Sequence, residues 1–343
     1  MLDRVGVEGE LEPLPGFGLA SLRRALALDH VEAKRGPGGR MEAVAVMFGG
    51  ERFEGELVRT QVEAASLVVV ATPEAWASAS RGSAREQEAI GRLKAATFAM
   101  VRENLFFDEP ANEEGQQDGI MRMAFAEAYR RGEVQYEVNG VTYEVFDRQG
   151  RARPPQVCVD FVTDAVERSA GRWWPGEEAE ARGRTAGRID IREVLPYRQV
   201  WRLVDIPKEH PGVAQVRSFG PSERAPFEQT GRFHAQLRRH RDELREGDVI
   251  VIYGLRDDGR HHYHSFYVYE TDPVRGVPTL LVDQAGHARL RPWNVIMRGA
   301  PKRSIHHRLR WSPDWLLEPE AVRAASGVVG EAGEVAARME ALW

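Results

Sequence analysis

Residues 154–162 read PPQVCVDFV and contain Cys158, the only cysteine in this chain of 343 residues. The two prolines hold the preceding chain extended, and we expect a helix from about residue 157 to residue 171. Phe161 and Val162 belong to the apolar stripe of this helix, on the side that carries the cysteine. A thiol at a helix N-terminus faces the positive end of the dipole and unpaired N–H groups, which favour a thiolate and an oxyanion. The stretch indicates a nucleophile or, as is commoner for a free cysteine, a small buried hydrophobic residue.

A nucleophilic cysteine needs a base, and the segment 261–269, HHYHSFYVY, supplies candidates. Alternation along a strand would place His262, His264, Phe266 and Val268 on one face and Tyr263, Ser265, Tyr267 and Tyr269 on the other. The next expected strand, 279–282, ends in Asp283 and Gln284, and either side chain could orient the His264 imidazole from a neighbouring strand. The alternative is a surface hairpin with solvated histidines.

Four segments, taken in order, resemble NlpC/P60-type cysteine peptidases of the papain-like superfamily. Residues 140–143, GVTY, resemble the G-x-P-Y segment of that family, and residues 158–162, CVDFV, resemble its C-S-G-F-V helix start. Residues 247–250, GDVI, resemble its G-D-L-V strand entry, and residues 264–267, HSFY, resemble the start of its H-V-G-I-Y strand. The resemblance extends over about residues 134–295.

The resemblance implies a role for each matching residue. Cys158 would be the nucleophile, His264 the base, Asp283 or Gln284 the residue that orients the histidine, and Tyr143 a polar neighbour. It also implies a papain-like fold and hydrolysis of amide bonds, with peptidoglycan stem peptides as the substrate and no cofactor. A peptidoglycan substrate would place the protein in the cell envelope or outside the cell.

The order of expected elements favours an α+β fold in which the Cys158 helix packs on an antiparallel sheet. Further helices are expected over residues 19–30, 86–107, 120–131 and 227–244, and further strands over residues 43–48, 52–59, 67–71 and 248–253. Asn139-Gly140 lies between two alternating segments and predicts a hairpin with a type I′ turn. We divide the chain into an α+β region of unknown role (1–115), a papain-like thiol hydrolase domain (116–317) and a helical tail (318–343).

Composition excludes several classes of protein. Basic residues number 47 and acidic residues 52, a net charge of -5, which does not call for a nucleic-acid partner. No run approaches the roughly 18 apolar residues of a membrane helix, and residues 1–18 lack the pattern of a secretory signal. We therefore expect a soluble chain without a membrane span. The resemblance implies that its partner is a peptide or peptidoglycan substrate. A single cysteine cannot form an internal disulfide.

Six histidines offer a different chemistry, because imidazole is a common zinc ligand. They are His261, His262, His264, His287, His306 and His307. Their spacing matches no recognised zinc motif, so we expect no metal. Trp173 and Trp174 follow the Cys158 helix and are expected to fill part of the core, with a carbohydrate platform as the alternative.

Residues 284–313 contain basic side chains and no acidic ones. The basic residues are Arg289, Arg291, Arg298, Lys302, Arg303, Arg308 and Arg310. We interpret the stretch as a solvated face, and an anion-binding face for nucleic acid or a polyanionic cell-wall substrate is the alternative. For the whole protein, the alternative to a thiol hydrolase is a non-catalytic binding or structural module with a papain-like fold.

Overall fold

A computed structural model of the chain describes residues 3–10, 30–35, 41–48, 51–59, 64–71, 73–112, 119–196, 198–241, 243–256, 259–272 and 276–325. The chain forms two compact units. The first comprises Met1–Ile90, Leu237–Arg245 and Thr271–Pro278, and the second comprises Gly91–Gln236, Glu246–Glu270 and Thr279–Trp343. Helix α2 (Pro73–Arg102) contributes residues to both units. The predicted boundary at residue 115 lies outside the described residues.

The first unit contains a five-stranded antiparallel sheet. Its strands, in chain order, are β1 (Asp3–Glu10), β2 (His30–Arg35), β3 (Met41–Phe48), β4 (Glu51–Arg59) and β5 (Ala64–Ala71). In space their order is β1-β5-β4-β3-β2. Strands β3 and β4 cover the two strands predicted over residues 43–48 and 52–59 and pair as an antiparallel hairpin, with Val46 opposite Phe53. The predicted helix over 19–30 falls almost entirely outside the described residues, and its last residue, His30, begins β2.

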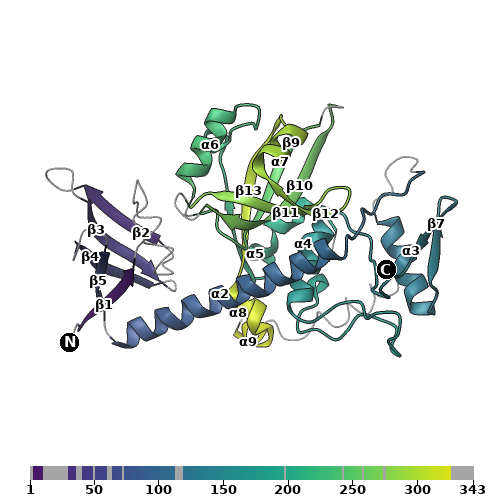
Figure 1. The fold of residues 1–343 in the computed structure, drawn as a ribbon, viewed down its shortest axis with the longest axis horizontal. Helices are drawn as coiled ribbons and strands as arrows, with labels where there is room; N and C mark the ends of the chain where they lie inside the picture. The colour runs from purple at the N-terminus through teal and green to yellow at the C-terminus, as the bar shows by residue number, and fades with distance from the viewer. Residues whose placement is uncertain are drawn as a thin grey trace. The chain divides into compact units, whose positions relative to one another are not determined.

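The second unit is α+β, as the sequence predicts, and is built around a six-stranded sheet (Figure 1). Its strands are β8 (Ala214–Ser218), β9 (Val249–Leu255), β10 (His261–Thr271), β11 (Pro278–Gln284), β12 (Ala288–Pro292) and β13 (Arg303–Trp311). The order across the sheet is β12-β11-β10-β9-β13-β8. Three of these strands, β9, β10 and β11, were predicted. Pairing of β9 with β10 and with β13 is antiparallel and puts His264 opposite Ile252.

The interpretation of residues 284–313 as a solvated basic face is wrong. Part of the stretch is β13, an interior strand between β9 and β8. The two tryptophans of the stretch, Trp293 and Trp311, are buried. Arg303 and Arg308 are buried, and Arg310 Nε donates to the buried Asp248 carboxylate at 2.7 Å. An arginine can be buried when a carboxylate or carbonyl meets it, and a single sequence does not show such partners.

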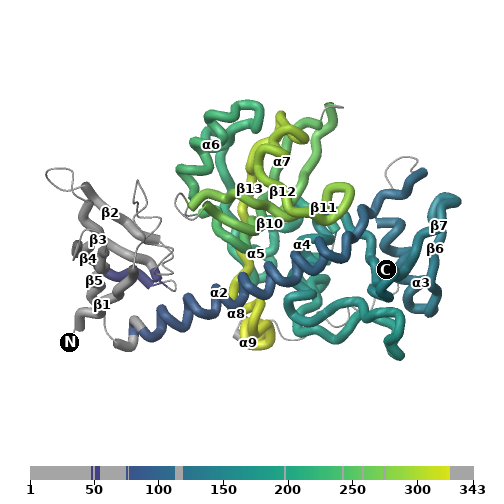
Figure 2. The backbone as a smooth tube through the Cα atoms, viewed as in Figure 1, coloured from purple at the N-terminus to yellow at the C-terminus, as the bar shows by residue number. Residues whose placement is uncertain are grey.

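Helix α4 (Cys158–Ser169) packs on one face of β10. Ser265 Oγ donates to the Cys158 carbonyl at 3.2 Å, and Tyr267 Oη donates to the Val162 carbonyl at 3.0 Å. Phe266, on the opposite face of β10, contacts Trp293, so the alternation predicted for this strand is confirmed. The path from α2 through α4 to the sheet can be followed by colour in Figure 2.

Helix α3 (Ile120–Arg131) and the hairpin of β6 (Gln135–Val138) and β7 (Val141–Glu144) form a separate cluster. Asn139 and Gly140 at the turn have φ values of 52° and 74°, as the predicted type I′ turn requires. Tyr136 of the hairpin packs edge-on against Phe125 of α3. Trp174 also packs edge-on against Phe125, so this tryptophan is a packing residue, as predicted.

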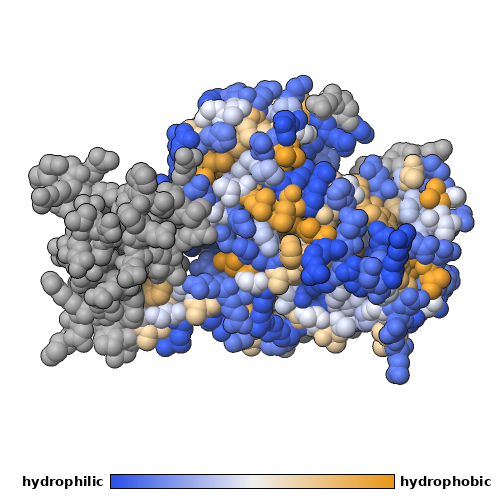
Figure 3. Space-filling model, viewed as in Figure 1, coloured by the Kyte–Doolittle hydropathy of each residue, from blue (hydrophilic) through white to orange (hydrophobic). Residues whose placement is uncertain are grey.

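Short elements complete the second unit. They are η2 (Ile191–Glu193), η3 (Val200–Val204), α5 (Ile206–Glu209), η4 (Pro221–Glu223), α6 (Thr230–Arg239), α7 (Trp293–Gly299), α8 (Pro313–Leu317) and α9 (Pro319–Ala325). Helix α6 also extends into the first unit. Helix α9 lies in the predicted helical tail, whose residues 326–343 lie outside the described residues. No helix in the described part of the chain is long and apolar enough to cross a membrane. The face in Figure 3 is mostly hydrophilic, with small separate apolar areas.

Candidate active site

Cys158 is the first residue of α4, and its side chain is buried, with 8% of the residue exposed. The Asp160 carboxylate accepts a hydrogen bond from the Val157 N–H at 2.8 Å and so caps the helix start. The N–H groups of the first turn have no intrahelical acceptors, and they lie beside the thiol. The helix start therefore offers both a cysteine and donors for a developing negative charge.

Ionic contacts fix the loop that precedes Cys158. Arg122 of α3 donates to the Pro155 carbonyl at 3.0 Å and forms a two-bond pair with Asp164 of α4 at 2.7 and 2.9 Å. Gln156 Nε2 also donates to Asp164, at 2.6 Å. Bidentate pairs of this kind set direction as well as distance, so the cysteine loop has a defined path into the helix.

The extended segment 105–108, which follows α2, connects the cysteine loop to the end of β11. On one side Gln156 N donates to the Phe106 carbonyl at 3.1 Å. On the other side Phe107 N donates to the Gly286 carbonyl at 3.1 Å, just after the predicted acidic residue Asp283. Two parts of the chain that are far apart in sequence are thereby held against one segment.

The structure brings His264 of β10 and Asp283 of β11 into direct contact. His264 Nε2 lies 2.6 Å from Asp283 Oδ2, and both residues are buried, at 7% and 0% exposure. Arg291 of β12 donates from Nε to Asp283 Oδ1 at 2.9 Å, and its Nη2 contacts Oδ2. Although burial raises the pKa of Asp283, the hydrogen bond from His264 and the charges of His264 and Arg291 lower it further, so the carboxylate is ionised.

His264 also interacts with Cys158. Burial lowers the pKa of this histidine, but the charge of Cys158, hydrogen bonds to Asp283 and Cys158, and the charge of Asp283 together raise it to about 9. Because Nε2 is bonded to Asp283, Nδ1 is the ring nitrogen left for the cysteine. A histidine with this pKa is protonated at pH 7 and can neutralise a neighbouring thiolate.

The three residues have complementary chemistry. A thiolate at Cys158 can attack an electrophilic carbon, and a protonated His264 can give its proton to a leaving group. Asp283 fixes the orientation of the imidazole and stabilises its charged form. The sequence predicted these three residues and left open whether Asp283 or Gln284 meets the histidine, and the contact is made by Asp283.

Gln284 and Tyr143 occupy different positions. Gln284 Nε2 donates to the carbonyls of Leu105 and Phe106, at 2.9 and 3.3 Å, so it holds the segment after α2. Tyr143 Oη accepts a hydrogen bond from Ala111 N at 3.0 Å. The Tyr143 ring stacks between Phe106 and Tyr136, with centroid distances of 6.1 and 5.5 Å. The structure therefore does not bring either residue into contact with the imidazole.

Three other histidines, His261, His306 and His307, have contacts of their own. His307 Nδ1 lies 2.9 Å from Ser218 Oγ. The pKa of His306 is lowered to about 4 by burial and by the charges of Arg224 and His307. His261 stacks on Tyr253. Across the described residues, no three His, Cys, Asp or Glu side chains are grouped so that they could hold a metal ion.

The sequence analysis did not predict Arg291 as a residue of the site. It appeared only as one of the basic residues after Asp283. A signal was present, because Arg291 lies one residue before the end of β12, which pairs with β11 and puts Leu281 opposite Arg291. A predicted β11–β12 hairpin would have placed Arg291 and Asp283 two positions apart on one face.

Comparison of this chain with protein-family models, curated proteins and solved structures gives no match. The relationship to NlpC/P60 peptidases therefore stays a prediction from the four sequence segments.

Proposed function

We propose that this protein is a cysteine hydrolase of amide bonds, with a papain-like arrangement of Cys158, His264 and Asp283. The observation that carries the proposal is the buried contact between the Asp283 carboxylate and the His264 imidazole. The charge of Cys158, at the start of α4, contributes to the raised pKa of that imidazole. The resemblance to NlpC/P60 peptidases supports peptidoglycan stem peptides as the substrate class.

In the proposed reaction, the Cys158 sulfur attacks the carbonyl carbon of the scissile amide, and N–H groups at the start of α4 bind the oxyanion. His264 Nδ1 gives its proton to the leaving amine, which leaves a thioester on Cys158. His264 then takes a proton from water, which attacks the thioester and releases the carboxylic acid and the free thiolate. Asp283 holds the imidazole through both steps.

The test has two parts, with the full chain used throughout. Alkylation by iodoacetamide at pH 7, followed by mass spectrometry, should be about tenfold or more faster than that of N-acetylcysteine, because a free thiol is only a few per cent thiolate at this pH. Stem peptides from purified peptidoglycan should be cleaved to give new amino groups, and Cys158→Ala should abolish cleavage. His264→Gln should slow both reactions.

One observation favours the alternative of a non-catalytic module. Cys158 and His264 are 8% and 7% exposed, so a substrate has little of either residue to reach. Under this alternative Cys158 reacts with iodoacetamide no faster than N-acetylcysteine, and no amide substrate is cleaved. Fast alkylation without cleavage would establish a reactive thiol and contradict the proposal that stem peptides are the substrate.

A further inference from the structure

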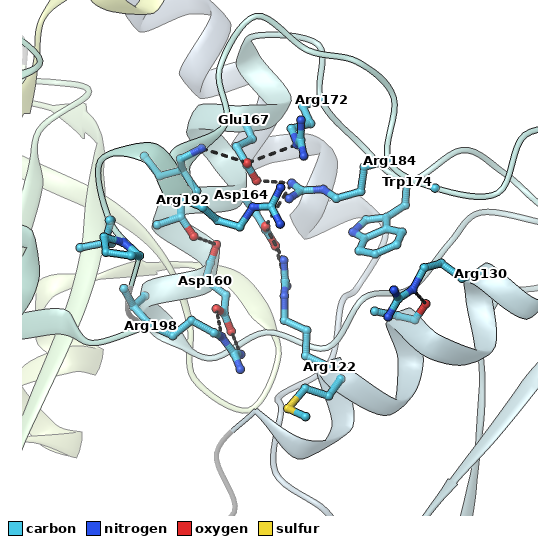
Figure 4. Close-up of a pocket in the computed structure, with 18 residues that line it drawn as sticks. Arg122, Arg130, Asp160, Asp164, Glu167, Arg172, Trp174, Arg184, Arg192 and Arg198 are labelled. Atoms are coloured by element: carbon cyan, nitrogen blue, oxygen red, sulfur yellow. Dashed lines mark hydrogen bonds and ion pairs between the residues drawn. The ribbon is translucent and has the colours of Figure 1, made fainter. Parts of the chain in front are cut away.

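A cavity of about 570 Å³ lies beside α4, on the side of the helix away from the sheet (Figure 4). Val159, Thr163 and Glu167 line it, and residues four apart share one face of a helix. Cys158 and Val162 belong to the opposite face, where Val162 contacts β10. The cavity is thus separate from the candidate active site, and its volume is within the range of small-molecule sites.

The cavity is lined by arginines from α3, from η2 and from loops between residues 172 and 198. These are Arg122, Arg130, Arg172, Arg184, Arg192 and Arg198. Opposite them stand three carboxylates of α4, which are Asp160, Asp164 and Glu167. Two further carboxylates bind these arginines from behind the wall, with Asp108 on Arg198 and Asp190 on Arg172. The wall of the cavity therefore combines guanidinium groups with carboxylates that pair with them.

Two donors at the wall lack acceptors. Arg184 contacts Glu167 through Nη2, while its Nε is shielded from solvent and has no hydrogen-bond acceptor among the described residues. Trp174 Nε1 is also shielded from solvent and has no hydrogen-bond acceptor among the described residues. The Arg184 guanidinium carbon lies 5.7 Å from the centroid of the Trp174 ring, so the two side chains are neighbours. Buried donors are rarely left without acceptors, and a carboxylate carries two oxygens that accept.

The rest of the wall is apolar. Met123 and Ala126 of α3 line one side, and Ile191 and Leu195 line another. Met123 is 47% exposed and lies at the edge, whereas Ile191 and Leu195 are buried. A ligand that fills the cavity therefore needs an apolar body in addition to its charged group.

We propose that this cavity binds a small organic acid, whose carboxylate contacts Arg184 and Trp174 and whose apolar body packs on Met123 and Leu195. The apolar part of the lining favours an organic acid over inorganic phosphate, which has no apolar body. Binding here is independent of Cys158, because the cavity and the thiol lie on opposite faces of α4.

The experiment is calorimetric titration of the full chain with phenylacetate, which combines a carboxylate with an aromatic body. Its ten or so non-hydrogen atoms are enough for a dissociation constant in about the millimolar range or tighter. Phenylacetamide has the same shape without the charge and should bind about tenfold more weakly or worse. Inorganic phosphate at the same concentration should not displace phenylacetate.

Variants locate the site. Met123→Glu places a negative charge at the edge of the cavity and should weaken phenylacetate binding about fivefold relative to Met123→Gln, the matched neutral variant. Trp174→Phe keeps a ring but removes the Nε1 donor and should weaken phenylacetate more than phenylacetamide. Cys158→Ala should bind phenylacetate as the unchanged chain does.

Four results would overturn the proposal. One is equal binding of phenylacetate and phenylacetamide, and another is tighter binding of phosphate. The third is the absence of saturable binding by acetate, hexanoate and phenylacetate alike. The fourth is loss of binding in Cys158→Ala, which would move the ligand to the candidate active site. Because Met123 is largely exposed, its two variants remain informative even if Trp174→Phe does not fold.

Discussion

The imidazole of His264 contacts the carboxylate of Asp283 through Nε2, 2.6 Å from Oδ2, and Arg291 holds the same carboxylate from the other side. Asp283 is fully buried, and a lone carboxylate there would tend to take up a proton. The hydrogen bond and charge of His264, together with the charge of Arg291, lower the pKa of Asp283 and keep it ionised. The charge of Cys158 and the contact with Asp283 in turn raise the pKa of His264, and Asp283 fixes the orientation of the imidazole. The state of the imidazole that faces Cys158 thus depends on β10, β11 and β12 together.

The substitution Asp283→Asn tests this dependence. Asparagine keeps the size of the side chain but loses the charge that stabilises the imidazolium, so the pKa of His264 should fall. We expect kcat for amide hydrolysis to drop by about a hundredfold or more, as when the aspartate of a catalytic triad is lost. Stopped assays with a stem peptide measure the rate, and circular dichroism checks that the fold is retained.

A matched double variant separates orientation from stability. Asp283→Asn leaves Arg291, whose side chain is only 13% exposed, without its partner, which should lower the free energy of unfolding by about 3 kcal/mol. Adding Arg291→Met removes that unpaired charge, so stability in urea should recover while turnover stays low. Recovery of turnover together with stability would mean that Asp283 acts only through folding.

The sequence predicts the fold best in segments where apolar residues recur with the clear period of a helix or a strand. The alternation on both sides of Asn139-Gly140 predicts β6, β7 and their turn, and the apolar stripe predicts α4. Strand β13 was missed, because its sequence RSIHHRLRW carries charged and histidine side chains on both faces. Those side chains are accommodated by partners such as Asp248, far away in sequence.

The site was predictable only as far as local chemistry extends. A cysteine at the start of a helix and a histidine on a strand can be recognised from the residues immediately around them. Asp283 and Gln284 are adjacent and point to opposite faces of β11, so the choice between them required the register of the sheet. Gln284 reaches the Leu105 carbonyl, which no local pattern indicates.

Gln284→Met should therefore act on stability. The variant loses two hydrogen bonds to the carbonyls of Leu105 and Phe106, which still accept from the backbone N–H groups of Ala288 and Gln156. We expect the free energy of unfolding in urea to fall by about 1 kcal/mol, with turnover per folded molecule unchanged. A large loss of turnover at unchanged stability would return Gln284 to the role of orienting residue.

Tyr143→Phe tests the role that the family resemblance implies for this tyrosine. The variant keeps the stacked ring and removes only the hydroxyl that accepts from Ala111 N. We expect turnover to change by less than about twofold and the free energy of unfolding to fall by about 1 kcal/mol, the value of one exposed hydrogen bond. A tenfold loss in kcat would show instead that the hydroxyl serves the reaction.

Removing Arg291 alone should leave Asp283 with His264 as its only charged partner. For Arg291→Met we expect the free energy of unfolding at pH 7 to fall by about 2 kcal/mol, since the buried carboxylate loses one of its two cationic partners. Arg289→Met is the matched control, because Arg289 precedes it on the same strand and donates to the Ala285 carbonyl. Equal effects of the two substitutions would contradict a specific role for the Arg291 pair.

The raised pKa of His264 predicts how stability and rate change in alkaline solution. Its folded pKa is about 9 and its ordinary value is 6.5, so the folded state holds the proton more tightly. The stabilisation is fully present below pH 6.5 and is lost as the pH rises through 9. The difference in unfolding free energy between the unchanged chain and His264→Gln should shrink over this interval.

Hydrolysis should decline above pH 9 for the same reason, because neutral His264 cannot protonate the leaving amine. Alkylation of Cys158 by iodoacetamide should not decline there, because that reaction needs only the thiolate. The two pH profiles, measured on one preparation, separate the proton donor from the nucleophile. The charged groups around the imidazole are Cys158 and Asp283, with Arg291 behind the carboxylate, so Asp283→Asn should move the decline in hydrolysis to lower pH. A decline that stays at pH 9 in Asp283→Asn would mean that another group sets it.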